Sequence, residues 1–135
     1  MRGILADINV GAQVRALLSI WTSDTWREFW HALGLATETF PNLGLPYDAP
    51  DLVIWTTCQR EGLVLITGNR NDDGPDSLEA AIRDENSPES LPVFTIADTN
   101  RVLGDREYAQ RVAERLIDYL MRIDEVRGVG RIYVP

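Results

Sequence analysis

The feature that most constrains this chain is a set of short segments that are apolar along their whole length and alternate with helical segments. In residues 62–73, GLVLITGNRNDD, five apolar or β-branched residues at 63–67 run directly into a polar segment. Similar runs occur at 3–7, 93–98 and 131–134. A strand that is apolar throughout is buried on both faces, as in parallel sheets that are covered by helices. The sequence therefore predicts a three-layer α/β/α fold with a mainly parallel sheet.

Segments with helix signals lie between these apolar runs. The predicted helices are 10–21, 22–34, 48–62, about 76–84, and 104–128, and a second strand is predicted at 35–40. Thr25 and Glu28 have the spacing of a capping box, and Gly34 is a typical helix end. The chain has 135 residues and 44% hydrophobic content, which suits one core better than two. We therefore expect residues 1–135 to form a single domain.

The net charge and the choice of basic residues exclude several kinds of protein. The formal net charge is −8, and all 13 basic residues are arginine. An acidic chain does not attract nucleic acid broadly, and a P-loop needs a lysine. Residues 64–69, VLITGN, are similar to a motif of haloacid-dehalogenase-like phosphatases, but that family has an Asp where this chain has Asn9 and a lysine that this chain lacks. Phosphate-accepting receiver domains rely on a lysine as well.

Nothing in the sequence indicates a membrane-bound or secreted protein. No continuous apolar run reaches about 18 residues, and the first residues do not form a charged-then-apolar leader. Cys58 is the single cysteine, so it cannot form an intramolecular disulfide, which agrees with a reducing compartment. We expect a cytoplasmic protein without membrane contact, in which Cys58 is a small core residue.

Acidic and amide side chains follow the predicted strands at their carboxyl ends. They are Asp7 after the first strand, Asp48 and Asp51 at the helix after the second, Asn69, Asn71, Asp72 and Asp73 after the third, and Asp98 after the fourth. Ligands of open α/β sheets bind beyond these strand ends. Crowded carboxylates repel unless a cation or protons intervene, and Mg²⁺ or Mn²⁺ prefers oxygen ligands. Helix capping and turn formation are the structural alternatives, and Asp7 fits a site best.

Two stretches of the chain resemble a known family. ILADINV, residues 4–10, is similar to the opening of small PIN-like proteins. DLVIWTTCQREGLVLITGNRND, residues 51–72, resembles their segment in which an Asp begins a helix, a Gly ends it, and a strand carrying T-x-D-x-D-F follows. Asp7 matches the first-strand acid of this family, and Asp51 matches the helix acid. The resemblance covers roughly residues 3–73, or as far as the next strand if that strand is included.

The chain departs from the family motif at positions that hold metal. Asn69 and Asn71 stand where the motif has its two Asp residues. Asp72 replaces the Phe, and Ile8 follows the first acid where the family has Glu. An Asn oxygen can coordinate a metal but adds no charge, so the cation affinity of such a site should fall.

The resemblance implies a PIN-like fold and a Mg²⁺- or Mn²⁺-dependent ribonuclease with a partly degenerate acidic site. Many members are toxins that an antitoxin protein holds inactive. The implied catalytic residues are Asp7, Asp51 and Asn69. The implied metal ligands are Asp7, Asp51, Asp72 and Asp98, and the implied contacts to the RNA substrate are Asn9, Arg70 and Asn71. The alternative is a catalytically inactive PIN-like module that binds other proteins.

Three tryptophans, Trp21, Trp26 and Trp30, lie close together in the sequence. Core packing is the expected role of this cluster. A part of it that is exposed would form a hydrophobic anchor for a homodimer or a regulatory partner, because Trp is common at binding hot spots.

The predicted helix 104–128 has an apolar face and a row of arginines on the opposite side. The row consists of Arg111, Arg115 and Arg122. Glu107 precedes the first of these and Asp118 precedes the last by four residues, which predicts a ladder of exposed salt bridges. A stripe that binds phosphate is the alternative.

Overall fold

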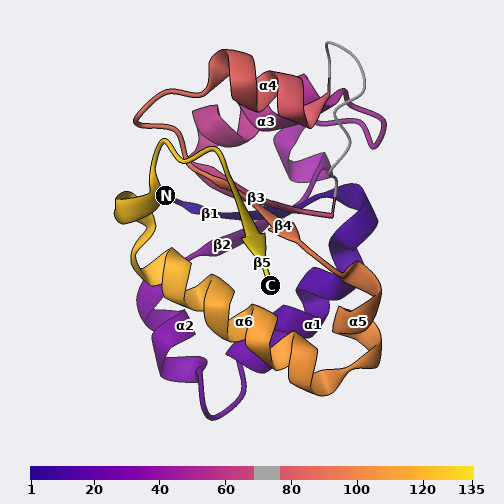
Figure 1. Cartoon of the computed structure of the whole chain (residues 1–135), viewed down its shortest axis with the longest axis vertical. Coiled ribbons are helices and arrows are strands. Elements are labelled where there is room, and N and C mark those ends of the chain that lie inside the picture. Colours follow the sequence, from indigo (N-terminus) through magenta and orange to yellow (C-terminus); the bar gives the residue numbers. More distant parts are fainter. Residues whose placement is uncertain (69–76) are drawn as a thin grey trace.

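Helices and strands alternate along most of the chain. The computed structural model describes residues 1–68 and 77–135 (Figure 1). The strands are β1 (Gly3–Ala6), β2 (Ala36–Glu38), β3 (Leu63–Thr67), β4 (Val93–Ile96) and β5 (Arg131–Val134). The α-helices are α1 (Gly11–Trp21), α2 (Arg27–Leu33), α3 (Asp51–Glu61), α4 (Leu78–Glu85), α5 (Thr99–Gly104) and α6 (Arg106–Met121). The 3₁₀ turns are η1 (Ile8–Val10), η2 (Pro41–Leu43) and η3 (Ile123–Val126).

The five strands form one sheet in the order β2-β1-β3-β4-β5, and every neighbouring pair is parallel. Helices α3 and α4 cover one face of the sheet, and α1, α2, α5 and α6 cover the other (Figure 1). The predicted three-layer α/β/α fold is therefore confirmed. None of the helices in the described part of the chain is long and apolar enough to cross a membrane.

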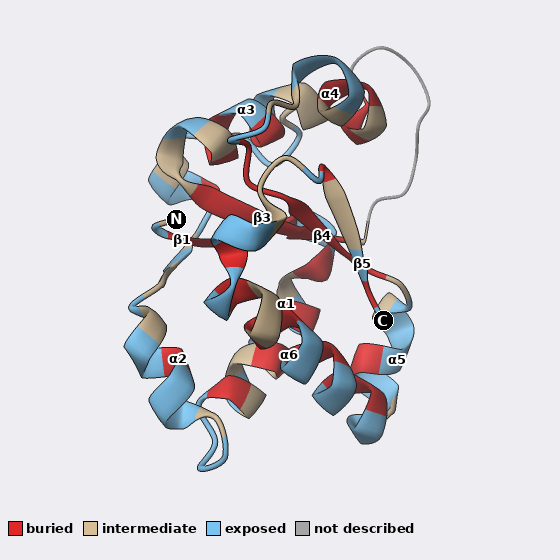
Figure 2. Ribbon diagram, turned by 60° about the vertical axis from the view of Figure 1, so that its left-hand side comes forward, coloured by how far each residue is buried: buried red, intermediate tan, exposed pale blue. Residues whose placement is uncertain are grey.

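Alternate residues of β1, β3 and β4 face two separate hydrophobic cores. Ile4 and Ile66 pack with residues of α1 and α6, whereas Leu5 and Leu65 pack with residues of α3 and α4. All five residues of β3 are buried, and the strands lie between helices whose outer surfaces are exposed (Figure 2). Burial on both faces explains why the sequences of the inner strands β1, β3 and β4 are apolar along nearly their whole length rather than at every second position.

Several element ends follow the signals in the sequence. Gly62 ends α3 in the left-handed conformation with φ of 69°, as a glycine at a helix end does. Gly34 ends α2 in the same way. The predicted capping box of α2 is wrong, because the residue before its first turn is Trp26 and makes no side-chain cap.

Two helices differ from the prediction in length or number. The long helix expected at 104–128 spans Arg106–Met121, and η3 follows it. Helix α5 was not predicted, since its six residues are too few for a recognisable apolar period. The helix expected from residue 48 begins at Asp51, and Asp48 lies exposed in the loop before it.

The parallel sheet places the starts of several helices at one edge. Helices α1, α3, α4 and α5 each follow a strand, so they begin at the edge where the strands have their carboxyl ends. The strand order reverses direction between β1 and β3. In doubly wound sheets ligands bind at this reversal, so the ends of β1 and β3 are the first place to look for a site.

Candidate functional site at the carboxyl edge of the sheet

Asp7 directly follows β1 at the reversal of strand order. Its backbone N–H donates to Ile66 O at 2.8 Å, which continues the pairing of β1 with β3. The side chain is only 7% exposed. Oδ1 accepts a hydrogen bond from Ile8 N at 2.8 Å, and Oδ2 accepts one from Thr67 Oγ1 at 2.8 Å. Each carboxylate oxygen is therefore held by one donor, and each keeps a further lone pair for a ligand.

Thr67 is a site residue that the sequence reasoning missed. It ends β3, is fully buried, and lies 60 residues from Asp7 in the sequence. A threonine is common in strands, so its residue type alone gives no signal. The parallel pairing of Ala6 with Ile66 brings the two side chains together at the ends of their strands.

Cys58 lies on the face of α3 that packs against the sheet. It is 1% exposed. Burial, and to a smaller extent the negative charge of Asp7, raise the pKa of the thiol to about 12. At neutral pH the thiol is protonated, and only the thiolate is a nucleophile. Cys58 is therefore the small core residue that was predicted.

Asp51 lies in the first turn of α3 at the same edge of the sheet. Its Oδ2 accepts a hydrogen bond from Leu78 N at 3.1 Å, which connects the starts of α3 and α4. The cap residue of α3 is Pro50, which makes no side-chain hydrogen bond. Asp48 therefore does not cap this helix in the way that the structural alternative had it, and Asp51 lies in the first turn of α3 while its side chain accepts a hydrogen bond from the first turn of α4.

Asp98 has a structural role at the start of α5. It is exposed, and its carboxylate caps the helix by accepting a hydrogen bond from Arg101 N at 3.2 Å. Within residues 1–68 and 77–135, no three His, Cys, Asp or Glu side chains are grouped so that they could hold a metal ion. Asp7, Asp51 and Asp98 therefore do not form a three-ligand cluster, and metal binding by any of them stays a prediction.

The remaining predicted site residues divide into two groups. Asn9 lies exposed in η1, two residues after Asp7. The polar residues after β3 lie outside the described part of the chain, and they are Asn69, Arg70, Asn71, Asp72 and Asp73. Their predicted roles are therefore not addressed by the structure.

Asp7 lines an open cavity of about 410 Å³ between β1, α1 and the loop after β2. Arg15 of α1 and Phe40 and Tyr47 of the loop are also part of its lining. The ring of Tyr47 is stacked against that of Phe40, with 6.2 Å between centroids and 27° between planes. No motif identified this aromatic pair, because Phe40 ends the predicted strand 35–40 and Tyr47 lies in the Pro- and Gly-containing segment that follows it.

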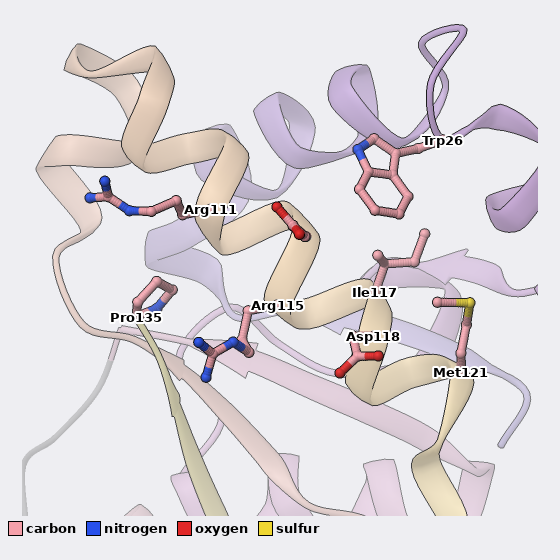
Figure 3. A pocket seen from close by; sticks show the side chains of 8 residues that line it. Trp26, Arg111, Arg115, Ile117, Asp118, Met121 and Pro135 are labelled. Carbon is pink, nitrogen blue, oxygen red and sulfur yellow. The ribbon is translucent and has the colours of Figure 1, made fainter.

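A second cavity of about 390 Å³ lies beside α6. Figure 3 shows Trp26, Ile117 and Met121 at one end and Arg111 and Arg115 near Pro135 at the other. Met121 is 43% exposed. Neither arginine forms a salt bridge with a residue in the described ranges, and Arg111 lies over the Tyr108 ring at 5.7 Å instead. This cavity thus combines an apolar end with a charged part, whose lining contains the two arginines and two acids, Glu114 and Asp118.

Two of the three tryptophans lie in the core, and one of the three arginines in the row forms its predicted salt bridge. Trp21 and Trp30 are buried and stacked, with ring centroids 4.9 Å apart. Trp26 is partly exposed and lines the cavity beside α6. Of the two predicted salt bridges on α6, the one between Asp118 and Arg122 is confirmed at 2.9 Å, and the one from Glu107 does not form.

Comparison with known proteins found no family model, no curated protein and no solved structure that matches this chain.

Proposed function

We propose that this chain is a PIN-like ribonuclease that depends on Mg²⁺ or Mn²⁺ and has a weakened acidic site. One observation carries the proposal: the buried carboxylate of Asp7 lies at the end of a central parallel strand, at the reversal of strand order, and borders an open cavity. A charge in this position is costly to desolvate. A bound cation offsets that cost and gives the carboxylate a chemical use.

The donor set fits a loosely held hard cation. Mg²⁺ keeps several waters and often takes only one or two carboxylates from the protein. Asp7 retains lone pairs on both oxygens, and Asp51 starts its helix at the same edge of the sheet. These two residues, with Asn69, would hold the cation, which supplies an activated water and stabilises charge on the phosphate.

Thr67 and the turn after Asp7 orient the carboxylate for this task. The Thr67 hydroxyl and the Ile8 N–H fix one oxygen each. Asn69 provides a neutral oxygen where the resembled family has a carboxylate, so the site carries less negative charge. We therefore expect the protein to bind the cation weakly and to cleave RNA slowly. An antitoxin-type partner is implied by the family resemblance alone.

Thermal unfolding with and without Mn²⁺ tests the cation site. The midpoint of the wild type should rise in Mn²⁺, because a ligand that binds only the folded state stabilises it. Asp7→Asn keeps the shape of the side chain and should abolish the rise. Asp24→Asn, at an exposed residue in the turn between α1 and α2, is the matched control and should leave it unchanged.

Restoring the missing carboxylate tests the nuclease activity. Asn69→Asp should lower stability without metal through like-charge repulsion, and should tighten Mn²⁺ binding and speed cleavage of a fluorescent single-stranded RNA. Asn42→Asp adds the same charge at an exposed loop residue and should do neither. If Asn69→Asp is destabilised equally with and without Mn²⁺ and cleaves no RNA, the nuclease proposal is abandoned.

An inactive interaction module is the second candidate, and the cavity beside α6 favours it. An apolar end formed by Trp26 and Met121 could anchor a second copy of the chain. Sedimentation between 1 and about 100 μM protein tests this, because a dimer with a dissociation constant in the micromolar range dissociates over these concentrations. Met121→Arg should then abolish the dimer. The control is Val53→Arg, at an equally exposed residue of α3, which should leave the dimer intact.

A further inference from the structure

We infer that the cavity beside Asp7 is a subsite for one nucleotide of single-stranded RNA, with its base on Tyr47 and its phosphate at Arg15. This inference deepens the proposed function and rests on it for the view that the bound RNA is a substrate. The binding step itself needs no cleavage, and it can be measured without the cation, where repulsion by the Asp7 carboxylate weakens it.

Tyr47 provides an aromatic surface that is held in place and open on one side. It is 65% exposed although it is a large ring, and its other side is stacked on Phe40, which is 3% exposed. The contact with the buried ring favours this orientation of the exposed ring. Bases stack on aromatic side chains of single-strand-binding proteins without regard to sequence, and a ring that is already positioned loses little conformational freedom on binding.

Arg15 provides a cation above the start of α1. A Cβ built on Gly11 would lie 3.3 Å from Arg15 Nη1, so the guanidinium folds back over this glycine. Arg15 forms no salt bridge or hydrogen bond with any residue of the described ranges, and it lines the cavity together with Asp7. Guanidinium groups are well suited to phosphate oxygens.

The net charge of the chain limits the contact to a short one. With a formal charge of −8, the protein as a whole does not attract an RNA backbone. The lining of this cavity of about 410 Å³ contains one arginine, one exposed aromatic ring and two acids, Asp7 and Glu38. Glu38 is paired with Arg2 at 2.8 Å, and the volume lies within the range of about 300–1,000 Å³ for small-ligand sites, which suits a single nucleotide. The phosphate would then lie beside the Asp7 carboxylate, where the proposed cation acts.

Fluorescence titration of a four-nucleotide RNA that contains 2-aminopurine, in buffer with EDTA, tests the subsite. The wild type should quench the probe on binding. Tyr47→Ala should weaken binding roughly 5- to 150-fold, the loss typical of one stacked base, whereas Tyr47→Phe should bind like the wild type. Tyr133→Ala removes a similarly exposed ring from the edge strand β5 and should have no effect.

Two further variants separate the phosphate contact from the shape of the cavity. Arg15→Ala should lower the salt dependence of binding by about 0.7 in the slope of log K against log salt, the value for one phosphate of a single strand. Arg60→Ala, at an exposed residue near the end of α3, should not. Gly11 has ordinary helical dihedrals, and a Cβ at this position lies 3.3 Å from Arg15 Nη1, so Gly11→Ala should fold normally, shift the guanidinium only slightly and bind nearly as the wild type does.

The outcomes distinguish this subsite from the proposed nuclease. If the wild type does not bind the probe, or if Tyr47→Ala and Arg15→Ala bind it as the wild type does, the subsite is overturned even where Mn²⁺ binding and cleavage are found. If binding depends on both residues but Mn²⁺ neither stabilises the protein nor supports cleavage, the subsite stands and the nuclease proposal fails.

Discussion

At the scale of single residues, the carboxylate of Asp7 depends on donors from two parts of the chain. One donor, Ile8 N, belongs to the next residue in the sequence, whereas the other, Thr67 Oγ1, lies at the end of another strand. A carboxylate with 7% exposure has little water to replace a lost donor. The hydroxyl of Thr67 therefore contributes to stability as well as to the orientation of the site.

We expect Thr67→Val to lower the free energy of unfolding by about 1–3 kcal/mol, because the substitution keeps the shape but removes a hydrogen bond to a buried charged group. Urea unfolding at pH 7 measures this. Thr57→Val is the control, since Thr57 is also buried but its hydroxyl bonds to no residue of the described ranges. Equal losses in the two variants would show that the bond to Asp7 contributes nothing specific.

The buried thiol of Cys58 should make the stability of the protein depend on pH in the alkaline range. The pKa of its thiol is raised from 9.0 to about 12 in the folded protein, so the unfolded chain loses this proton first. The contribution of this thiol to the free energy of unfolding is fully present below pH 9. It should decrease between about pH 9 and 12, by up to about 1.4 kcal/mol per pH unit. Cys58→Ala should show a flatter decline in urea unfolding at pH 8 to 11. A thiol reagent that modifies the native protein rapidly at pH 8 would contradict the raised pKa.

The sequence could identify some residues of the candidate site and not others. Asp7 stood out because an acid ends an apolar run, which is a local pattern. Thr67, Tyr47 and Arg15 were missed because their importance arises from contacts between distant segments: a strand pairing, a loop that stacks on Phe40, and a helix turn over Gly11. No local pattern of residue types encodes such contacts.

At the scale of elements, substitutions at the start of α5 test whether Asp98 only caps this helix or also binds a metal ion. Asp98→Ala should lower the free energy of unfolding by about 0.5–2 kcal/mol, whereas Asp98→Asn should have little effect, because Asn caps a helix as well as Asp. Neither variant should change the response of the melting temperature to Mn²⁺. A loss of that response in Asp98→Asn would instead support the metal role predicted from the sequence.

The pairing of β1 with β2 depends on Gly3. A Cβ at this position would lie 2.3 Å from Ala36 O, which is a backbone atom and cannot move without shifting the strand. Gly3→Ala should therefore cost about 1–3 kcal/mol in urea unfolding, as overpacking does. Gly104→Ala in α5 meets no atom within 4 Å and should be neutral or slightly stabilising. A tolerated Gly3→Ala would mean that the edge strand is loosely held.

Element prediction succeeded where one segment alone determines the outcome. The run 63–67 is apolar at every position and forms β3 with the predicted bounds. The helix expected at 104–128 was too long because its helical pattern continues beyond Met121, whereas the backbone at Arg122 leaves the helical region. The order of the strands, with β1 between β2 and β3, follows from packing among segments and cannot be obtained from any one of them.

At the scale of the whole molecule, the negative charge opposes folding. The formal net charge is −8, so the excess negative charges repel one another when folding brings them together. Salt screens this repulsion, because the Debye length falls from about 30 Å at 0.01 M to about 8 Å at 0.15 M ionic strength. The melting temperature should therefore rise over this range of NaCl. Asp48→Arg, at an exposed loop residue, changes the charge by two units and should reduce the rise. A melting temperature that falls with salt would show that ion pairs dominate.

The central place of β1 has a consequence for synthesis on the ribosome. β1 is made first, yet Thr67, at the end of its neighbour β3, follows Asp7 by 60 residues. At roughly 5–20 residues per second, the nascent chain carries β1 for about 3–12 seconds before this neighbour exists. During that interval Asp7 lacks the hydroxyl of Thr67, and β1 lacks the strand that pairs with it on the inner side. The candidate site can therefore form only after β3 has been translated.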